Sequence, residues 1–209
     1  MTARGVSLAV ALLAAASPAA TVTLSAEDVD AIGRVSIAEA GNQSDAGLAA
    51  VIDVILHRAA SGGFGRGVQG VLDAPRQFEP VSRVGGSWRN LPPPTAEQRT
   101  RIATILSLKA DGVLGDVSQG GLYFQNEAIV RKRAAAGQVK SSLVGFSGMP
   151  VTVRIGEHTF YRSARPAEAV RVVAVPAVQV SAAPASGRSA RDDYSAAIQR
   201  VLGGAELPE

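Results

Sequence analysis

The most apolar helix expected from the sequence follows Ser44 and ends before a glycine-rich loop at residues 61–67. Ser44 can cap its first turn, and its large aliphatic side chains recur at helical spacing: Leu48, Val51, Ile52, Ile55 and Leu56. A helix that is apolar around most of its circumference has to be enclosed by other elements. We therefore expect this helix to cross the centre of the fold.

Further helices and a small sheet are expected around it. Ser25 with Asp28 forms a capping box for a helix that runs to about Ala40, and Thr95 with Gln98 forms another for a helix that runs to about Ala110. Residues 122–124 are typical of a short strand. Residues 151–155 and 158–161 alternate like a hairpin around a two-residue turn at 156–157. The pattern predicts a mainly helical α+β domain with a small antiparallel sheet or hairpin.

The domain is expected over residues 24–165, with different segments at either end. Residues 1–20 have a basic start, a short apolar run and a small-residue end, which is typical of a secretory signal peptide. Residues 166–189 are rich in Ala, Val and Pro and indicate a linker or tail, although residues 170–175 could instead form an edge strand. Residues 190–209 include a short amphipathic helix that could engage a protein partner.

Charge and cysteine content exclude some classes of protein. The chain has no cysteine, which rules out disulfides and thiolate chemistry. Its formal net charge of +3 suits an anionic polymer, but the only tight basic cluster is at residues 131–133, where a solvated face is the simpler interpretation. A nucleic-acid-binding protein is disfavoured because no recognition motif is present.

Glu39 is the strongest catalytic candidate. It lies four residues after Val35 and seven after Ile32, on the apolar stripe of its helix and near the C-terminal end. Burial and the negative end of the helix dipole both raise the pKa of a carboxyl group there. A general acid at a glycosidic oxygen needs such a raised pKa. The competing interpretation is a structural glutamate paired with an arginine.

Other chemistries find little support. Gly65, Gly67 and Gly70 spell G-x-G-x-x-G, but a helix precedes them, so a loop is expected rather than a dinucleotide site. The two histidines, His57 and His158, have no metal-binding spacing, and no G-x-S-x-G motif is present. We therefore expect neither a metal nor a cofactor. Two pairings of an aromatic ring with an amide could bind sugars: Gln77 with Phe78, and Tyr123 with Asn126.

Five segments, in order, resemble the bacterial cell wall hydrolases of the spore-cortex-lytic type, the SleB/CwlJ-like family. They are residues 37–40 around Glu39; Gly47 with the helix at 51–58; residues 71–81 with Pro75, Gln77 and Phe78; G-L-Y-F-Q-N at 121–126; and R-I-G-E-H-T-F-Y-R at 154–162. Together they cover about residues 30–162. The chain departs from the family pattern at Gly41-Asn42, which replace Arg-Gly; at Gln43, which replaces a glutamate; and at His57, which replaces an asparagine.

The resemblance implies a lysozyme-like domain that cleaves peptidoglycan between N-acetylmuramic acid and N-acetylglucosamine. The signal-peptide pattern of residues 1–20 predicts export, to the periplasm or the outside of the cell. It carries the catalytic role over to Glu39 and favours a lytic transglycosylase, which needs one carboxyl group. The groove is then expected to be lined by Gln43, Gln77, Phe78, Tyr123, Asn126, His158 and Tyr161.

Three alternatives stay open. One is a muramidase in which Asp45, Asp53 or Glu79 places a water molecule. Another is an amidase that cuts the muramyl–peptide bond. The third is a wall-binding or virion-associated protein without activity. No membrane span is expected once a signal peptide is removed.

Overall fold

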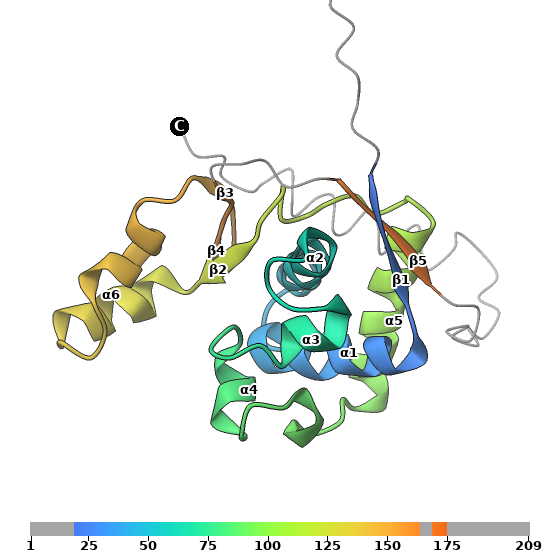
Figure 1. Cartoon of the computed structure of the whole chain (residues 1–209), viewed down its shortest axis with the longest axis horizontal. Helices are drawn as coiled ribbons and strands as arrows, with labels where there is room; N and C mark the ends of the chain where they lie inside the picture. Colours follow the sequence, from blue (N-terminus) through green and yellow to red (C-terminus); the bar gives the residue numbers. More distant parts are fainter. Residues whose placement is uncertain (1–18, 164–168, 175–209) are drawn as a thin grey trace, which may run out of the picture.

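The structure, a computed structural model, describes residues 19–163 and 169–174, and these form an α+β domain (Figure 1). Its class agrees with the prediction from sequence. Six α-helices lie in the described ranges, namely α1 (Ala26–Ala40), α2 (Asp45–Ser61), α3 (Gly67–Leu72), α4 (Glu79–Arg83), α5 (Ala96–Ala110) and α6 (Glu127–Ala135). The 3-10 helices are η1 (Trp88–Asn90) and η2 (Ser141–Ser147). The strands are β1 (Ala20–Leu24), β2 (Tyr123–Gln125), β3 (Val151–Ile155), β4 (His158–Tyr161) and β5 (Val170–Ala174).

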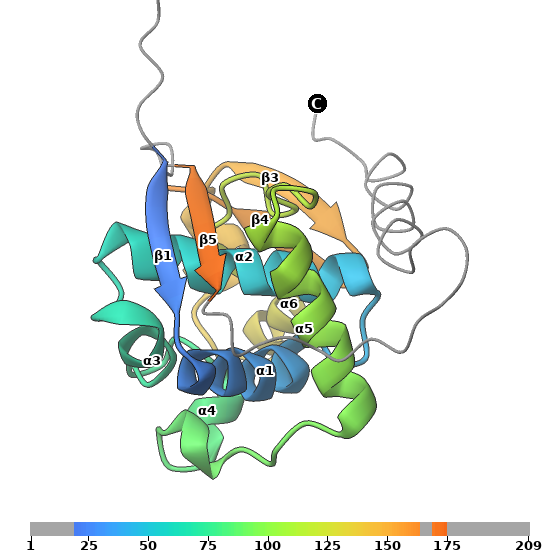
Figure 2. The same cartoon turned by 90° about the vertical axis from the view of Figure 1, so that its right-hand side faces the viewer.

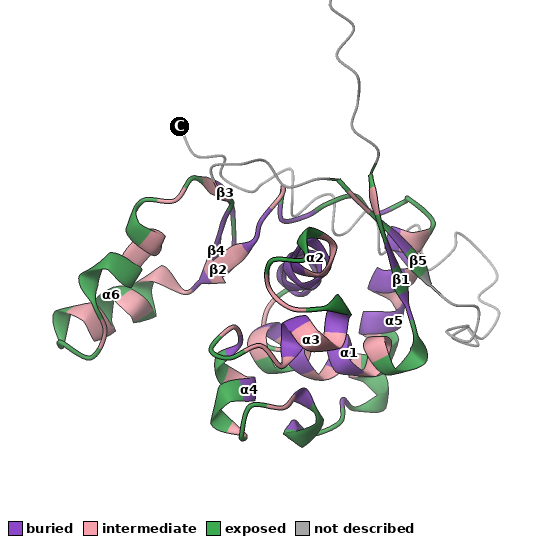
Figure 3. Ribbon diagram, in the orientation of Figure 1, coloured by how far each residue is buried: buried purple, intermediate pink, exposed green. Residues whose placement is uncertain are grey.

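Helix α2 lies at the centre of the domain, as its sequence predicts. Every residue from Ala46 to Arg58 is buried, and α1, α3, β1 and β2 pack around it (Figure 3). Leu48, Ile52 and Ile55 are fully enclosed, and burial of each such side chain stabilises the fold by roughly 1.5–3 kcal/mol. Ser44 accepts a hydrogen bond from the Gly47 backbone N–H and so begins the helix.

The two predicted capping boxes are both present. Ser25 and Asp28 exchange hydrogen bonds at the start of α1, and Thr95 and Gln98 do so at the start of α5. These bonds satisfy backbone N–H groups that have no partner within the helix. The boundaries of α1 and α5 are therefore set locally, by the residues predicted to set them.

The antiparallel sheet has the strand order β2–β4–β3, and its hairpin is the predicted one. Gly156 turns between β3 and β4 with a φ of +57°. Phe124, His158 and Phe160 share one face of the sheet, since alternate residues of a strand point the same way and Phe124 pairs with Phe160. Phe160 is fully buried, so this face packs on the helical core.

A second, parallel sheet joins the two ends of the described chain. Strand β1 pairs with β5 from Ala20↔Val170 to Leu24↔Ala174, and Figure 2 shows the two side by side. The interpretation of residues 166–189 as a linker is therefore wrong for Val170–Ala174, where the alternative edge strand is what forms. Burial of Val22 and Val172 against the core explains why this segment is ordered as a strand.

The other predictions about the two ends of the chain concern residues that the structure does not describe. Residues 1–18 of the predicted signal peptide, and the predicted C-terminal helix, lie outside the described residues. Among the described helices, none has both the length and the apolar character that a membrane crossing requires.

Candidate active site

The Glu39 side chain is half-buried in the last turn of α1. Burial raises the pKa of its carboxyl group from 4.5 to about 7, and the nearby Glu79 carboxylate adds to the rise. The charge of Arg58, a hydrogen bond from the Glu79 backbone and the charge of Arg83 act in the opposite direction. The carboxyl group therefore holds its proton to near neutrality while remaining within reach of a cation.

That cation, Arg58, comes from α2 and is buried, with 4% of its surface exposed. Its guanidinium carbon lies 5.0 Å from the ring centre of Phe64, 5.1 Å from that of Phe78 and 5.8 Å from that of Tyr123. Its Nε donates to the Leu122 carbonyl over 2.8 Å, whereas its buried Nη1 has no hydrogen-bond partner among the described residues.

Desolvation makes the Arg58 charge costly. Burial lowers the pKa of Arg58 to about 10, and the charges of Tyr123 and Glu39 partly offset that effect. An arginine held this way beside a carboxyl group can stabilise the carboxylate when it forms. Arg58 is a site residue that the sequence pattern did not predict. The available signal was a single cation near the end of an otherwise apolar helix.

Tyr123 is the first residue of β2, and its ring lies near Arg58. Its ring centre lies 5.6 Å from that of Phe64 and 5.4 Å from that of Phe146, and it remains half-buried. Tyr123 is thus a partly exposed residue whose ring lies near the Arg58 guanidinium. This geometry is compatible with the predicted stacking on a sugar.

Phe78 and Tyr161 do not fit their predicted role. Each is about 1% exposed, so neither ring offers a face to a sugar. Phe78 instead packs against Arg58, and the Tyr161 hydroxyl donates to Glu127 Oε1 over 2.5 Å. Burial, together with that hydrogen bond and the Glu127 charge, raises the pKa of Tyr161 above its ordinary value. Phe78 therefore packs behind Arg58, and Tyr161 lies buried against Glu127 and Phe146.

Gln43 and Asn126 meet at the turn of the β3–β4 hairpin. The Glu157 backbone N–H donates to Gln43 Oε1 over 3.2 Å, and Asn126 Nδ2 donates to the Glu157 carboxylate over 3.3 Å. Gly156 has a φ of +57°, which favours glycine, and a Cβ there would lie 2.4 Å from Gln43 Oε1 and displace that side chain. Gln43 thus holds the hairpin turn to the loop between α1 and α2, and Asn126 holds it to the start of α6.

His158 and Gln77, the other two residues predicted to line the groove, do not take part in the contacts of Gln43 and Asn126 with the hairpin turn. His158 is buried between Phe124 and Phe160, its ring centre 5.2 Å and 6.2 Å from theirs. Its Nδ1 has no hydrogen-bond partner among the described residues, and burial lowers its pKa. Gln77 is half-buried in the loop between α3 and α4. The structure therefore gathers Glu39, Phe78 and Tyr123 around Arg58, and places His158 within the core face of the sheet.

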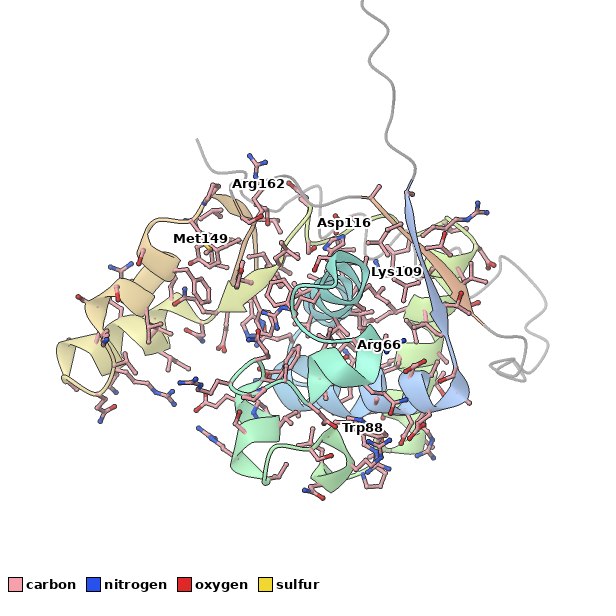
Figure 4. The ribbon with its side chains drawn as sticks, in the orientation of Figure 1. Arg66, Trp88, Lys109, Asp116, Met149 and Arg162 are labelled. Carbon is pink, nitrogen blue, oxygen red and sulfur yellow. The ribbon has the colours of Figure 1, made fainter. Side chains whose placement is uncertain are left out.

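The opposite side of α2 fixes the loop that leads into β2. Asp53 pairs with Lys109 over 2.5 Å and accepts a hydrogen bond from the Val117 backbone over 2.7 Å, while His57 Nδ1 lies 3.0 Å from the Gly121 carbonyl oxygen. Figure 4 shows Lys109 beside α2, on the side away from α6. These contacts position Tyr123, which follows the loop.

Ion pairs distinguish the three carboxylates that were considered for placing a water molecule, namely Asp45, Asp53 and Glu79. Asp53 is committed to Lys109, and Asp45 pairs with Arg101 over 2.7 Å. Of the three candidates, Glu79 is the one whose charge affects Glu39. In the described ranges, no group of three His, Asp or Glu side chains is placed to hold a metal ion.

Comparison with known proteins gives three results. No curated protein matches the chain significantly. Among solved structures, it is similar to the catalytic domain of the germination-specific lytic transglycosylase SleB from Bacillus anthracis, with 22% identity and a TM-score of 0.48, over 66% of this chain and 97% of that one. A family model described as Cell Wall Hydrolase matches residues 42–161, more than half of the chain, beginning three residues after Glu39. The chain therefore belongs to the cell wall hydrolase family.

Proposed function

We propose that this protein cleaves the glycan strand of peptidoglycan between N-acetylmuramic acid and N-acetylglucosamine, with Glu39 as the catalytic acid and base. The observation that carries the proposal is a half-buried carboxyl group whose pKa is raised to about 7, near the Arg58 cation, which itself lies 5.8 Å from the ring centre of the half-buried Tyr123. Membership of the cell wall hydrolase family supports the choice of substrate.

In the proposed reaction, Glu39 first gives its proton to the glycosidic oxygen. The bond to the anomeric carbon of muramic acid breaks, and an oxocarbenium-like state forms. Arg58 stabilises the new Glu39 carboxylate, because its charge favours the ionised form. That carboxylate then takes the proton of the muramic acid primary hydroxyl, whose oxygen attacks the anomeric carbon. The products are an anhydromuramic end, a released strand whose N-acetylglucosamine carries a free 4-hydroxyl, and a re-protonated Glu39.

The direct test is digestion of purified sacculi by Glu39→Gln. Glutamine keeps the shape but carries no transferable proton, so cleavage should fall by at least about a hundredfold. Glu97→Gln, an exposed carboxylate in the first turn of α5, is the matched control and should cleave like the wild type. Full activity of Glu39→Gln would refute the assignment.

A muramidase is the second candidate, because Glu79 adjoins Glu39 and stays ionised. Its partial burial raises its pKa, but the hydrogen bond from Arg83 and the charge of Arg133 outweigh that effect and lower it. One protonated and one ionised carboxyl group is the combination a hydrolytic glycosidase uses. Mass spectrometry of the products separates the candidates: anhydro ends indicate a transglycosylase, reducing ends a muramidase and free stem peptides an amidase. Binding to sacculi without cleavage would indicate a non-catalytic wall protein.

The proposed substrate lies outside the cytoplasm, which agrees with the predicted export signal at residues 1–20. N-terminal sequencing of the protein recovered from its natural compartment tests this prediction. A mature chain that starts near residue 20 would support export through that signal.

A further inference from the structure

Residues 126–149, which we name the basic arm, join β2 to β3 and contribute no buried residue through either of their helices. In Figure 1, α6 and η2 project from the sheet, away from the central helix α2. Figure 3 shows their surfaces as exposed or half-buried throughout. An element that buries none of its residues adds little to the hydrophobic core. Its composition therefore has to be explained by something other than core packing.

The charge of the arm is the first clue. It contains four basic residues and one acidic residue, a net charge of +3, which equals the formal net charge of the whole 209-residue chain. The remaining residues therefore sum to zero. The excess of positive charge therefore equals that of the basic arm alone. Its charged residues are Glu127, Arg131, Lys132, Arg133 and Lys140. Such a concentration attracts anionic groups more strongly than scattered charges would.

The cations of the arm are accessible. The Arg131 side chain is 68% exposed, and its contact with Glu127 is long at 3.5 Å. Lys132 and Lys140 are exposed and form no ion pair within the described part of the chain. Ile129 and Leu143, which are 47% and 46% exposed, lie on the same projection. The arm thus combines free cations with exposed aliphatic side chains.

The arm also borders the candidate active site. Phe146 lies 5.4 Å from Tyr123, ring centre to ring centre, and Arg133 Nη1 lies 3.3 Å from the Glu79 carboxylate on α4. Both Tyr123 and Glu79 belong to the surroundings of Glu39 and Arg58. A substrate held at Glu39 would therefore reach the arm through a group that projects sideways from the sugar chain.

We propose that the basic arm binds the acidic stem peptide attached to the muramic acid at the cleaved bond. This inference rests on the proposed function, because it needs the glycan strand at Glu39. A stem peptide leaves the sugar through the lactyl ether and carries free carboxylates and alanine methyl groups. The carboxylates match Lys132, Lys140 and Arg131, and the methyl groups match Ile129 and Leu143. An anionic membrane would offer similar charges, but contacts of the arm with Tyr123 and Glu79 favour a ligand of the site itself.

The test compares a double reversal in the arm, Lys132→Glu with Lys140→Glu, with a charge-matched control, Arg66→Glu with Arg162→Glu. Arg66 and Arg162 are exposed and lie outside the arm (Figure 4). Each double variant is assayed on intact sacculi and on the same glycan strands stripped of peptides by an amidase. The arm variant should lose roughly tenfold in cleavage of intact sacculi and change less than about twofold on stripped strands. The control should match the wild type on both.

The same variants are made in a Glu39→Gln background and tested for co-sedimentation with both substrates, so that binding is measured without cleavage. If the protein with Glu39 intact cuts neither substrate, while binding to intact sacculi in the Glu39→Gln background depends on the arm, the proposed cleavage is overturned and binding of the stem peptide by the arm stands. Equal losses on both substrates, or no loss on either, would overturn the inference. So would arm-dependent binding to vesicles of anionic phospholipid with unchanged cleavage of sacculi.

Discussion

Glu39 and Glu79 hold their protons over different pH ranges although the charge of one affects the other. Burial keeps Glu39 protonated to about pH 7, whereas Arg83 and Arg133 keep Glu79 ionised well below that. The difference in pKa comes from position. Glu39 is half-buried in the last turn of α1, whereas Glu79 is exposed on α4. Each residue can therefore be tested through the pH dependence of the other.

Replacing Glu39 by glutamine should alter how stability depends on pH. Between pH 4.5 and 7 the unfolded chain loses the Glu39 proton while the folded chain keeps it, so wild-type stability falls as pH rises. Above pH 7 the carboxylate stays buried at a cost of up to about 3 kcal/mol, which glutamine avoids. Urea unfolding at pH 4 and pH 8 measures this. Glu39→Gln should gain relative to the wild type at pH 8 only, and an equal difference at both pH values would contradict the buried carboxyl.

Replacing Glu79 by glutamine removes a negative charge that raises the pKa of Glu39. The alkaline limb of the pH–rate profile should therefore move below pH 7. If Glu79 also places a water molecule, the rate itself should fall by about a hundredfold or more. A shifted profile at nearly full rate supports the single-carboxyl mechanism, and an unshifted profile would show that the two groups do not interact.

Replacing Arg58 by methionine should move the alkaline limb of the pH–rate profile above pH 7, because the Arg58 charge lowers the pKa of Glu39. Methionine fills the space under Phe64 and Phe78 without a buried charge, so the fold should persist by circular dichroism. Arg58→Lys keeps the charge and is the control; it should leave the limb near its wild-type position. If both variants shift it alike, packing rather than charge explains the effect.

Replacing Lys109 by methionine should destabilise the protein by about 3–5 kcal/mol, because it leaves Asp53 buried without its 2.5 Å partner. Adding Asp53→Asn should recover most of that loss, since asparagine can still accept the Val117 backbone hydrogen bond. Thermal unfolding of the single and double variants measures both effects. Lys132→Met, at an exposed position, should stay within about 0.5 kcal/mol of the wild type.

Replacing Gly65 by alanine should cost about 1–3 kcal/mol, because its Cβ would lie 2.3 Å from the Gly70 carbonyl oxygen at a φ of +146°. The neighbouring Phe64 contacts both Arg58 and Tyr123, so activity should fall with stability. Gly63→Ala has nothing within 4 Å and serves as the control. The close approach of Gly65 to Gly70 also explains the G-x-G-x-x-G spacing without a nucleotide.

The parts of the fold that could be predicted are those encoded locally. The capping boxes at Ser25 and Thr95, and the alternation on either side of Gly156, each lie within a few residues. Strand β1 was missed because its partner is about 150 residues away, a pairing that no local pattern shows. Helix α6 was missed because it has no apolar face for periodicity to detect.

Of the proposed site, the partial burial of Glu39 could be predicted from its sequence position. Glu39 stood out because a carboxyl group on an apolar stripe has few interpretations. Phe78 and Tyr161 were misplaced, since an aromatic residue in a sugar-like motif does not reveal whether its ring faces solvent or the core. Arg58 was overlooked because its role depends on three rings from separate segments, which only the folded chain brings together.

The pairing of β1 with β5 has a consequence for synthesis of the chain on the ribosome. Strand β1 emerges before any other described element, yet its partner emerges last. Until β5 emerges, the backbone N–H and C=O groups of β1, and its apolar Val22 and Leu24, have no neighbouring strand to join. The β1–β5 sheet can thus be completed only after Ala174 has left the ribosome. Until then, the edge of β1 that pairs with β5 stays unpaired in the nascent protein.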